Sequence, residues 1–523
     1  MTALLERPAP VVDHRGPMLA LARVESVRLV RHPLVLAASV LFLGPWLFFL
    51  ARGDDRYPGL RDAALELQFL VLLLFGSAVM VAANLGALRA HRHHVDEFFG
   101  VLTMSRARRT AGLLLALLPT GGLVTVLVLL RLGVSAALPG AAGRPQWAEV
   151  LTSPALVLLL GVIGIGLAGL VRSVVVAPVG VLGILVLVLI GGVAGTPARP
   201  LMAVLPLIFR TPPYALPAEL VDRPSTGHLV YVVGVTAVLA VAALVRAGAR
   251  GVPVSVAGGL AGALVVAGVA VQVPANTDVV RARAAAVAAP APLHTCRTVD
   301  GSTYCAFDDF TPWIDAWAET VRAVRRPMPS AGPALFVRQR IPVDGEWLGS
   351  SSSLEELQAE AAVRRDDDRT AGMPDAVPIG TEWSDRAAAA LAAAVAFRLI
   401  TGASPDNGSG LVCGARGALV VWLVGQAGGH IAAGLREADK FSWGSLSLGD
   451  PVLTRIGVSV PDSDAASGLA LLKRPVGEAT TLVRQHWAAL TDPTAGVDRF
   501  AALLGVPVAA QPPPEERTVG CAS

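Results

Sequence analysis

The sequence predicts a membrane protein, in which a bundle of transmembrane α-helices is followed by a mainly helical α+β extracytoplasmic domain. Composition is the first reason, because 53% of the 523 residues are hydrophobic and only 16% are charged, far from the balance of a soluble chain. The second is placement: long uncharged runs stop near residue 275, and most acidic residues follow it. The basic half is therefore also the apolar half, so no nucleic-acid partner is expected.

Seven uncharged runs are long enough to cross a lipid membrane, since about 20 residues, with a range of roughly 17–25, span its hydrocarbon core as a helix. They predict a transmembrane domain over residues 34–274. Only Arg172 separates the fourth run from the fifth, so these two are predicted to form a tight hairpin. The predicted spans lie at about 34–51, 67–88, 111–130, 151–171, 173–198, 229–245 and 251–274.

Residues 1–33 form a polar, arginine-rich lead-in. Within it, Met18–Arg31 places apolar and charged residues on opposite sides at helical spacing, which is typical of an amphipathic helix on a membrane surface. With the N-terminus in the cytoplasm, the inner segments hold 13 arginines and the outer ones 8, as the positive-inside rule requires. Seven spans then place the chain after residue 275 outside a plasma membrane.

Small residues in two spans could let helices approach one another closely. In contrast, ionisable residues are missing from the centres of the spans, which argues against an ion-coupled transporter. The small residues are Gly161, Gly164, Gly166, Ala168 and Gly169 in the fourth span, and Gly258 and Gly262 in the seventh.

The proline-rich segment Pro200–Thr226 lies between the fifth and sixth spans and contains an apolar stretch too short to cross a membrane. Two interpretations stay open. One is a re-entrant or interfacial helical hairpin, whose bent backbone must be buried in protein or face water. The other is an ordinary outer loop with an amphipathic helix.

The remainder of the chain divides into a linker over residues 275–293, an extracytoplasmic domain over 294–510 and a tail over 511–523. Helices are predicted at 311–326, with Thr311 as N-cap, at Asp385–Ile400, with Ser384 as N-cap, and at Gly477–Leu490. Short strands are predicted at Phe336–Pro342 and Val377–Gly380, and Ala418–Gly425, too short to span, is expected in the core.

All four cysteines follow residue 275, in the part predicted to lie in an oxidising space where disulfides persist. Cys296 and Cys305 enclose a short polar loop and are predicted to be bonded to each other. Cys413 and Cys521 could form a second pair. The alternative is four free thiols in a cytoplasmic tail.

No catalytic residue is predicted, because the sequence contains no GxxxxGK[ST], HExxH, CxxC or GxSxG motif. The chain is therefore not expected to be an enzyme. His91, His93 and His94 could begin a metal site, but Arg92 among them would repel a cation. Surface polar residues are the better interpretation, and no metal is expected.

The polar segment 89–110, between the second and third spans, is the strongest candidate for a functional surface. Ser105 can cap the next helix, whose first turns hold Arg106, Arg108 and Arg109. Exposed phenylalanines are costly unless they meet a membrane or a partner. The segment is thus either a docking surface for a protein or a helix packed on the membrane. Read as a helix, its first part presents Val95, Asp96, Glu97, Phe98 and Phe99.

Residues 18–247 resemble the permease subunits of ABC-2-type, exporter-type ABC transporters. Three features carry the resemblance: an amphipathic helix ending at Arg31-His32-Pro33, the loop just described, and a broken outer segment between the fifth and sixth spans. In the loop, Asp96-Glu97-Phe98-Phe99 is followed by Ser105-Arg106 and Arg108-Arg109. Thr103 stands where the family often has proline. A seventh span and an outer domain follow the usual six spans, as in some actinobacterial permeases.

The resemblance implies that two permease halves, identical or different, form a pathway for export. A separate ATPase, which itself binds ATP and Mg, would dock on each half, so this chain would need no cofactor. The docking residues would be Asp96, Glu97, Phe98, Phe99, Ser105, Arg106 and Arg109. A different class of function is a non-transporting membrane anchor whose outer domain binds a ligand or partner. A degenerate membrane peptidase would need a catalytic constellation that the sequence lacks.

Overall fold

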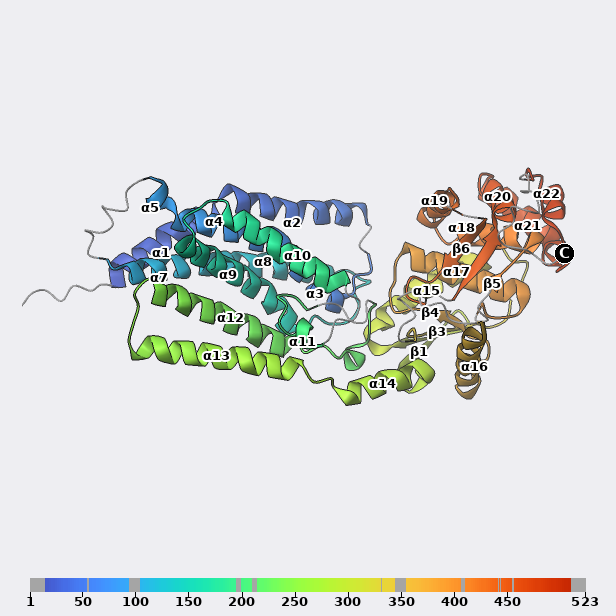
Figure 1. Ribbon diagram of the computed structural model, residues 1–523. Coiled ribbons are helices and arrows are strands. Elements are labelled where there is room, and N and C mark those ends of the chain that lie inside the picture. Colours follow the sequence, from blue (N-terminus) through green and yellow to red (C-terminus); the bar gives the residue numbers. More distant parts are fainter. Residues whose placement is uncertain are drawn as a thin grey trace, which may run out of the picture.

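The computed structural model has two parts, a bundle of long helices and a mixed α/β domain at one end of it (Figure 1). It describes residues 15–53, 56–93, 104–193, 199–208, 214–330, 332–343, 354–405, 410–440, 442, 444–453 and 456–508. Among these residues, six helical segments are long and apolar enough to cross a membrane, as a multi-pass membrane protein requires. They are Pro33–Arg52, Leu60–Ala87, Arg106–Ala136, Trp147–Leu170, Ser225–Arg246 and Val252–Ala288.

Three of the six segments are single helices and three are composite. The single ones are α2 (Pro33–Arg52), α9 (Trp147–Leu170) and α12 (Ser225–Arg246). The second segment joins α3 (Leu60–Val71), the π-helical turn η1 (Leu72–Gly76) and α4 (Ser77–Ala87). The third joins α7 (Arg106–Leu115) and α8 (Leu118–Ala136), and the last joins α13 (Val252–Gln272) and α14 (Thr277–Ala288).

Six of the seven predicted spans coincide in position with these helical segments, though not in every detail. The second span begins at Leu60 and not at residue 67, because α3 includes charged residues that a search for uncharged runs excludes. The fifth predicted span contains α10 (Val176–Val193), an apolar helix shorter than the six segments above. Residues 194–198 lie outside the described residues, so the seven-span arrangement stays a prediction.

The bundle has two unlike ends, and Figure 1 shows the domain at only one of them. The domain end comprises the segments 56–59, 137–146, 214–224 and 273–276. The distal end comprises α1 (Arg15–Val30), α5 (Arg89–Arg92), the start of α7 and the turn 247–251. The helix predicted at Met18–Arg31 is α1, and it packs against α7. Its predicted division into an apolar and a charged side is wrong, because Leu19, Val24 and Val27 are exposed.

Close helix packing at α9 confirms part of the small-residue prediction. A Cβ at Gly164 would come within 2.2 Å of the Met80 carbonyl oxygen, and one at Gly161 within 2.6 Å of Leu117 Cδ2. The absent side chain lets α4 and α9 meet, and Asn84 Nδ2 donates to the Gly164 carbonyl oxygen at 3.0 Å. A Cβ at Gly166 would have no such neighbour within 4 Å.

The prediction for the seventh span is wrong in its residues. A Cβ at Gly262 would meet nothing within 4 Å, and one at Gly258 would be in ordinary contact with Val241. The α12–α13 contact instead depends on Gly234 and Gly268, where a Cβ would approach backbone atoms at 2.8 Å and 2.6 Å. A GxxxG spacing alone does not identify the face that a neighbouring helix covers.

The segment after the fifth predicted span is irregular in its described part, with the short helix α11 (Arg199–Met202) followed by turns. Its carbonyl oxygens accept hydrogen bonds from side chains of the neighbouring helices. His228 Nε2 donates to the Pro206 carbonyl oxygen at 3.1 Å, and the Tyr231 hydroxyl donates to the Val204 carbonyl oxygen at 2.7 Å. Residues 209–213 lie outside the described residues, so the two interpretations of Pro200–Thr226 stay open. Ala203, Leu205 and Leu207 of this irregular segment are buried against the neighbouring helices.

The domain contains two small sheets. In the first, β1 (His294–Val299) and β2 (Ser302–Phe307) form an antiparallel hairpin, and β3 (Phe336–Gln339) and β4 (Val377–Ile379) extend it in parallel. The hairpin turns at Asp300 and Gly301, both at positive φ, as a two-residue turn requires. The second sheet has the order β5 (Gly410–Leu411), β7 (Gly457–Pro461), β6 (Ser445–Gly449).

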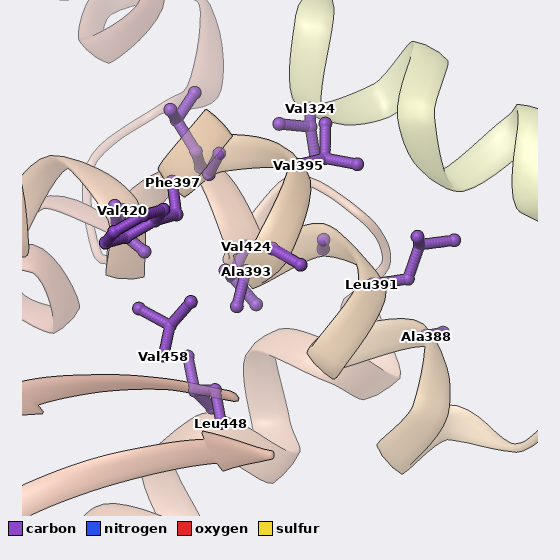
Figure 2. Close-up of a cluster of buried hydrophobic side chains, with 14 of the residues drawn as sticks. Val324, Ala388, Leu391, Ala393, Val395, Phe397, Val420, Val424, Leu448 and Val458 are labelled. Carbon is purple, nitrogen blue, oxygen red and sulfur yellow. The ribbon is translucent and has the colours of Figure 1, made fainter. Parts of the chain in front are cut away.

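Helices pack on these sheets around one hydrophobic core (Figure 2). Within it, Val395 and Phe397 of α17 lie near Val420 and Val424 of α18, and Leu448 and Val458 come from the second sheet. The domain helices are α15 (Ile314–Arg325), α16 (Leu354–Thr370), α17 (Asp385–Thr401), α18 (Gly414–Gly425), α19 (Gly429–Asp439), α20 (Asp462–Leu471), α21 (Val476–Leu490) and α22 (Val497–Leu504).

Most predicted elements of the domain are present. Ser384 caps α17 by accepting from the Ala387 amide, and Ala418–Val424 is buried as predicted. The helix predicted from Thr311 differs, because a 3₁₀ turn over Asp308–Trp313 precedes α15 and Thr311 is not its N-cap. The predicted linker contains α14, which Asn276 caps.

Candidate functional site

At the distal end, helix α1 is joined to the polar segment 89–110. The Glu25 carboxylate accepts a hydrogen bond at 2.6 Å from Arg89, which is the first residue of that segment. It also accepts one at 2.8 Å from Arg28 of its own helix. The Glu25 side chain is only 11% exposed, whereas both arginines remain substantially in water. Helix α1 and the start of the segment therefore form one unit.

The second half of this segment begins α7 as the sequence predicted. Ser105 Oγ accepts from the Arg108 amide at 3.4 Å and so caps the helix. Arg106 and Arg108 are exposed and Arg109 is partly buried. Cations in the first turn oppose the helix dipole, so these arginines do not serve the helix itself. They give the distal end a basic surface.

The acidic and aromatic half of the predicted docking surface lies outside the described residues. It comprises Asp96, Glu97, Phe98 and Phe99. The structure therefore places Ser105, Arg106 and Arg109 at the distal end beside α1 and does not address the other four residues. Sequence alone carries that part of the prediction.

His32 sits at the junction of α1 and α2, where its Nδ1 accepts from the Leu34 amide at 3.3 Å. Burial, and then the charge of Arg89, lower the pKa of His32 below its usual value. A neutral imidazole with Nδ1 unprotonated is the form that can accept this bond. The turn between the surface helix and the first span is thus fixed by a neutral histidine.

The domain end contains a buried charge cluster that the sequence analysis missed. Arg223 Nη1 lies 3.1 Å from Glu149 Oε1, and its Nη2 lies 3.4 Å from Asp62 Oδ1. The exposed fractions of these side chains are 4%, 0% and 12%. Ser225 also donates to Glu149 at 2.7 Å. The two carboxylates lie in the first turns of α9 and α3, where the helix dipole favours an anion.

Hydrogen bonds fasten the domain to the outer segments of the bundle. Trp313 Nε1 donates to the Gly140 carbonyl oxygen at 2.9 Å, and the Gly143 amide donates to the Asp309 carbonyl oxygen at 2.8 Å. Thr381 Oγ1 donates to the Ala215 carbonyl oxygen at 2.5 Å. The hydrophobic core of the domain continues across this junction, through residues such as Tyr214 and Leu216 of the bundle.

A cavity of about 240 Å³ lies at the same junction. The bundle contributes α3, α8 and residues 57–59 and 215 to its lining, and the domain contributes residues 313 and 381–383. The lining combines three aromatic side chains with carboxylates and one guanidinium. These side chains are Tyr57, Trp313, Trp383, Asp62, Glu66, Glu382 and Arg131.

The cysteine prediction is confirmed where the structure can test it. Cys296 and Cys305 are bonded to each other and face one another across the β1–β2 hairpin. Cys413 is also disulfide-bonded. Cys521, its predicted partner, lies outside the described residues.

The chain matches no protein-family model, and no curated protein or solved structure is detectably similar to it. Its function is therefore argued from its own residues. Within the described ranges, no three His, Cys, Asp or Glu side chains converge as a metal site. The basic surface at the distal end could bind a partner protein, and the cavity at the junction could bind a ligand.

Proposed function

We propose that this chain is the permease subunit of an ATP-driven transporter of the ABC-2 type, working in export at the plasma membrane. One observation carries the proposal. Helix α1 is bonded through Glu25 to Arg89, at the start of the long polar segment 89–110. A surface helix and a polar loop held as one unit would transmit the movement of a docked protein to the spans.

In this account the distal end faces the cytoplasm and a separate ATPase docks on it. ATP and Mg would be bound by that partner alone. The acidic pair Asp96 and Glu97 would meet basic residues of the ATPase, and Phe98 and Phe99 would fill an apolar groove. Two permease halves, identical or different, would pair in the membrane. ATP-driven closure of the ATPases would then change access between the spans.

The disulfides support the proposed orientation. Bonds involving Cys296, Cys305 and Cys413 belong in an oxidising compartment. If the domain faces outward, its disulfides lie in an oxidising compartment and the docking surface at the opposite end lies in the cytoplasm. The excess of arginine in the segments assigned to the cytoplasm agrees with it.

A second candidate is a membrane-anchored protein that binds a ligand or partner with its domain and transports nothing. The cavity at the junction favours it, because a binding site needs no partner ATPase. In that case the distal end would be a surface for lipid head groups. The two candidates differ in whether ATP hydrolysis depends on this chain.

The proposal is tested by purifying the full chain in mild detergent from its native host and identifying what remains bound. We expect an ATP-binding subunit to co-purify, and the complex to hydrolyse ATP. The double substitution Glu97→Ala/Phe98→Ala should remove that subunit and the hydrolysis together.

The matched control is Asp278→Ala/Val280→Ala on α14, which likewise replaces one acidic and one apolar residue; Asp278 and Val280 are both exposed. It should leave the complex intact. If no ATPase co-purifies while a known transporter keeps its own under the same conditions, the permease proposal fails and the membrane-anchored binding protein takes its place.

A further inference from the structure

Strand β1 forms an open edge of the first sheet of the domain. The sheet has the order β1-β2-β3-β4, so β1 has a neighbouring strand on one side only. Its four central residues, Thr295–Thr298, are all exposed. The register with β2 is continuous over six residue pairs. The strand therefore contains no bulge, and it contains no proline, two features that commonly protect a free edge from pairing.

The register with β2 determines where the backbone groups of β1 point. Opposite residues of an antiparallel pair alternate between hydrogen-bonded and non-hydrogen-bonded pairs, and the Cα atoms of the second kind are closer, about 4.5 Å apart. The Cα atoms of Cys296 and Cys305 are 4.1 Å apart, which makes these residues a non-hydrogen-bonded pair. By alternation, the pairs two positions away on either side belong to the same class.

Hydrogen bonds on the other side of β2 agree with this assignment. The Thr303 amide donates to the Leu335 carbonyl oxygen at 2.8 Å, and the Phe307 amide donates to Gln339 Oε1 at 3.0 Å. Both amides therefore point from β2 toward β3 and away from β1. The residues opposite them on β1 direct their own amides the other way, toward the open edge.

Three residues of β1 present backbone groups at this edge. His294, Cys296 and Thr298 each direct one N–H and one C=O away from β2. Among the residues that the structure describes, none forms a hydrogen bond with these six groups. A row of donors and acceptors with the spacing of a strand is a template for one more strand.

The sequence of β1 matches a second copy of itself in one antiparallel register. Pairing about a two-fold axis at Cys296 sets His294 of each copy opposite Thr298 of the other, so every outward group finds a partner. A shift by two residues in one direction would oppose Arg297 to its own counterpart, and like charges opposite one another are destabilising. The same shift in the other direction would set Thr298 opposite Pro292, which has no N–H.

Charge also favours a second copy over an unrelated strand. In the same register Arg297 faces Thr295 of the second copy in a non-hydrogen-bonded pair, where side chains lie closest. The Thr295 hydroxyl donates to the Asp308 carboxylate, and Arg297 is paired with Asp315 of its own chain. The guanidinium of each copy would thus lie beside a carboxylate of the other as well as its own.

The membrane makes so small a contact effective. Stable interfaces between freely diffusing proteins bury about 1,200–2,000 Å², more than two short strands can bury. Two copies in one membrane share a thin layer and a common orientation, which raises their effective concentration. Strand β1 is connected to α14, the end of the last long apolar segment, by residues 289–293 alone.

We propose that β1 is a contact between two copies of this chain, in which the strands pair antiparallel about a two-fold axis at Cys296 and join the two four-stranded sheets into one. The inference goes beyond the proposed permease function and does not rest on it, because a membrane-anchored binding protein would pair in the same way. In a permease with two identical halves, the contact would hold the halves together outside the spans.

The register is tested by cross-linking. Two differently tagged full chains are co-expressed, one with Thr295→Cys and the other with Arg297→Cys, and their membranes are oxidised with copper phenanthroline. Positions 295 and 297 oppose one another across the two-fold axis as a non-hydrogen-bonded pair, close enough for a disulfide. We expect a covalent dimer that carries both tags. Copies that share one cysteine position, either 295 or 297, should give about tenfold less.

A second variant acts on the edge itself. Thr298→Pro removes one outward N–H, and Thr298→Val is the matched control, because it keeps the amide and equally lacks the hydroxyl that contacts Thr303. Added to the cysteine pair, the proline should lower the yield of dimer about tenfold, and the valine should leave it unchanged. Peptide mapping must show an intact Cys296–Cys305 bond. If Thr298→Pro fails to fold, the comparison of cysteine positions decides alone.

Four results would overturn the proposal. The first is the lack of a two-tag dimer from folded protein, and the second is equal cross-linking between copies that share one cysteine position. The third is an unchanged yield of dimer in a folded Thr298→Pro protein. The fourth is cross-linking of Arg297→Cys to a different protein in place of the second copy. None of these results bears on whether an ATPase binds the distal end, so the two proposals fail separately.

Discussion

The two ends of the helix bundle treat charge in opposite ways. At the domain end, Arg223 is 4% exposed and Glu149 is fully buried in one ion pair, with Asp62 beside them. At the distal end, Arg28 is 56% exposed and Arg89 is 41% exposed although both bind Glu25. The domain end encloses its arginine together with its carboxylates, whereas the distal end leaves the arginines in water around a largely buried Glu25.

The difference separates a fixed junction from a surface that can accept a partner. A buried pair that loses one member leaves the other charge without solvent, so its geometry is strongly held. An exposed pair contributes little and can exchange partners at low cost. This contrast suits a domain locked to the bundle at one end and an exchangeable protein contact at the other.

Removal of the buried arginine should have the largest effect on stability. Arg223→Ala would leave Glu149 and Asp62 without their cation, and we expect a loss of about 3–5 kcal/mol in the free energy of unfolding. Arg28→Ala at the distal end should cost less than about 1 kcal/mol. Thermal unfolding in detergent measures both, and similar losses in the two variants would remove the contrast between the ends.

Removal of the disulfide in the β1–β2 hairpin should have the next largest effect on stability. Its bond closes a short loop with a sequence separation of 9, for which the chain-entropy account gives about 2–3 kcal/mol. Cys296→Ser/Cys305→Ser should therefore lower the melting temperature of the domain. The double variant must also run as a monodisperse peak on size exclusion. A melting temperature equal to that of the unaltered chain would mean that the hairpin is held by its neighbours and not by the bond.

Packing of the bundle toward the distal end is tested by two glycines of α9. Gly164→Ala would place a Cβ within 2.2 Å of the Met80 carbonyl oxygen, and such overpacking costs about 1–3 kcal/mol. Gly166→Ala is the matched control, because its Cβ would meet nothing within 4 Å and alanine favours a helix. Equal melting temperatures for the two variants would contradict the tight contact between α4 and α9.

The smallest effect concerns Asp464 in the domain, away from both ends. Burial raises the pKa of this carboxyl from 3.8 to about 6. A raised folded-state pKa means that stability is highest below pH 4 and is lost as the pH rises through 6. Asp464→Asn cannot ionise, and its side-chain oxygen can still accept from the Gly414 amide.

We therefore expect Asp464→Asn to stabilise the chain by about 1–2 kcal/mol at pH 7.5 and to leave stability unchanged near pH 4. Melting temperatures measured from pH 4 to 8 give the difference directly. A stabilisation that is the same at both ends of this range would show that ionisation of Asp464 is not its source.

Hydropathy predicted the spans because a helix that crosses lipid must be apolar along its whole length. The buried cluster of Arg223, Glu149 and Asp62 was not predicted, because its members are far apart in the sequence. Arg223 lies 161 residues from Asp62 and 74 from Glu149, and no local pattern announces a pairing over such distances. The same distance effect concealed the cavity, whose walls come from both parts of the molecule.

The sequence also contains local patterns that indicate elements beyond those predicted. Asp300-Gly301, midway between the bonded cysteines, is a typical two-residue turn that would have predicted the β1–β2 hairpin. Charged residues at the start of α3 shortened the predicted second span, since a search for uncharged runs cannot know that Asp62 has a buried partner. Ser105 and Ser384 were predicted correctly as caps, because a cap depends mainly on its neighbours in sequence. Thr311 was not, because a 3₁₀ turn over Asp308–Trp313 precedes α15.

The most direct test is to measure on which side of the membrane each end of the bundle lies. Single cysteines would be introduced at Arg108→Cys on the distal end and at Asp278→Cys beside the domain, both at exposed positions. A membrane-impermeant maleimide would then be applied to intact cells and to permeabilised ones. We predict labelling of Asp278→Cys in intact cells and of Arg108→Cys only after permeabilisation. Labelling of Arg108→Cys in intact cells would put the proposed docking surface out of reach of cytoplasmic ATP and contradict the permease account.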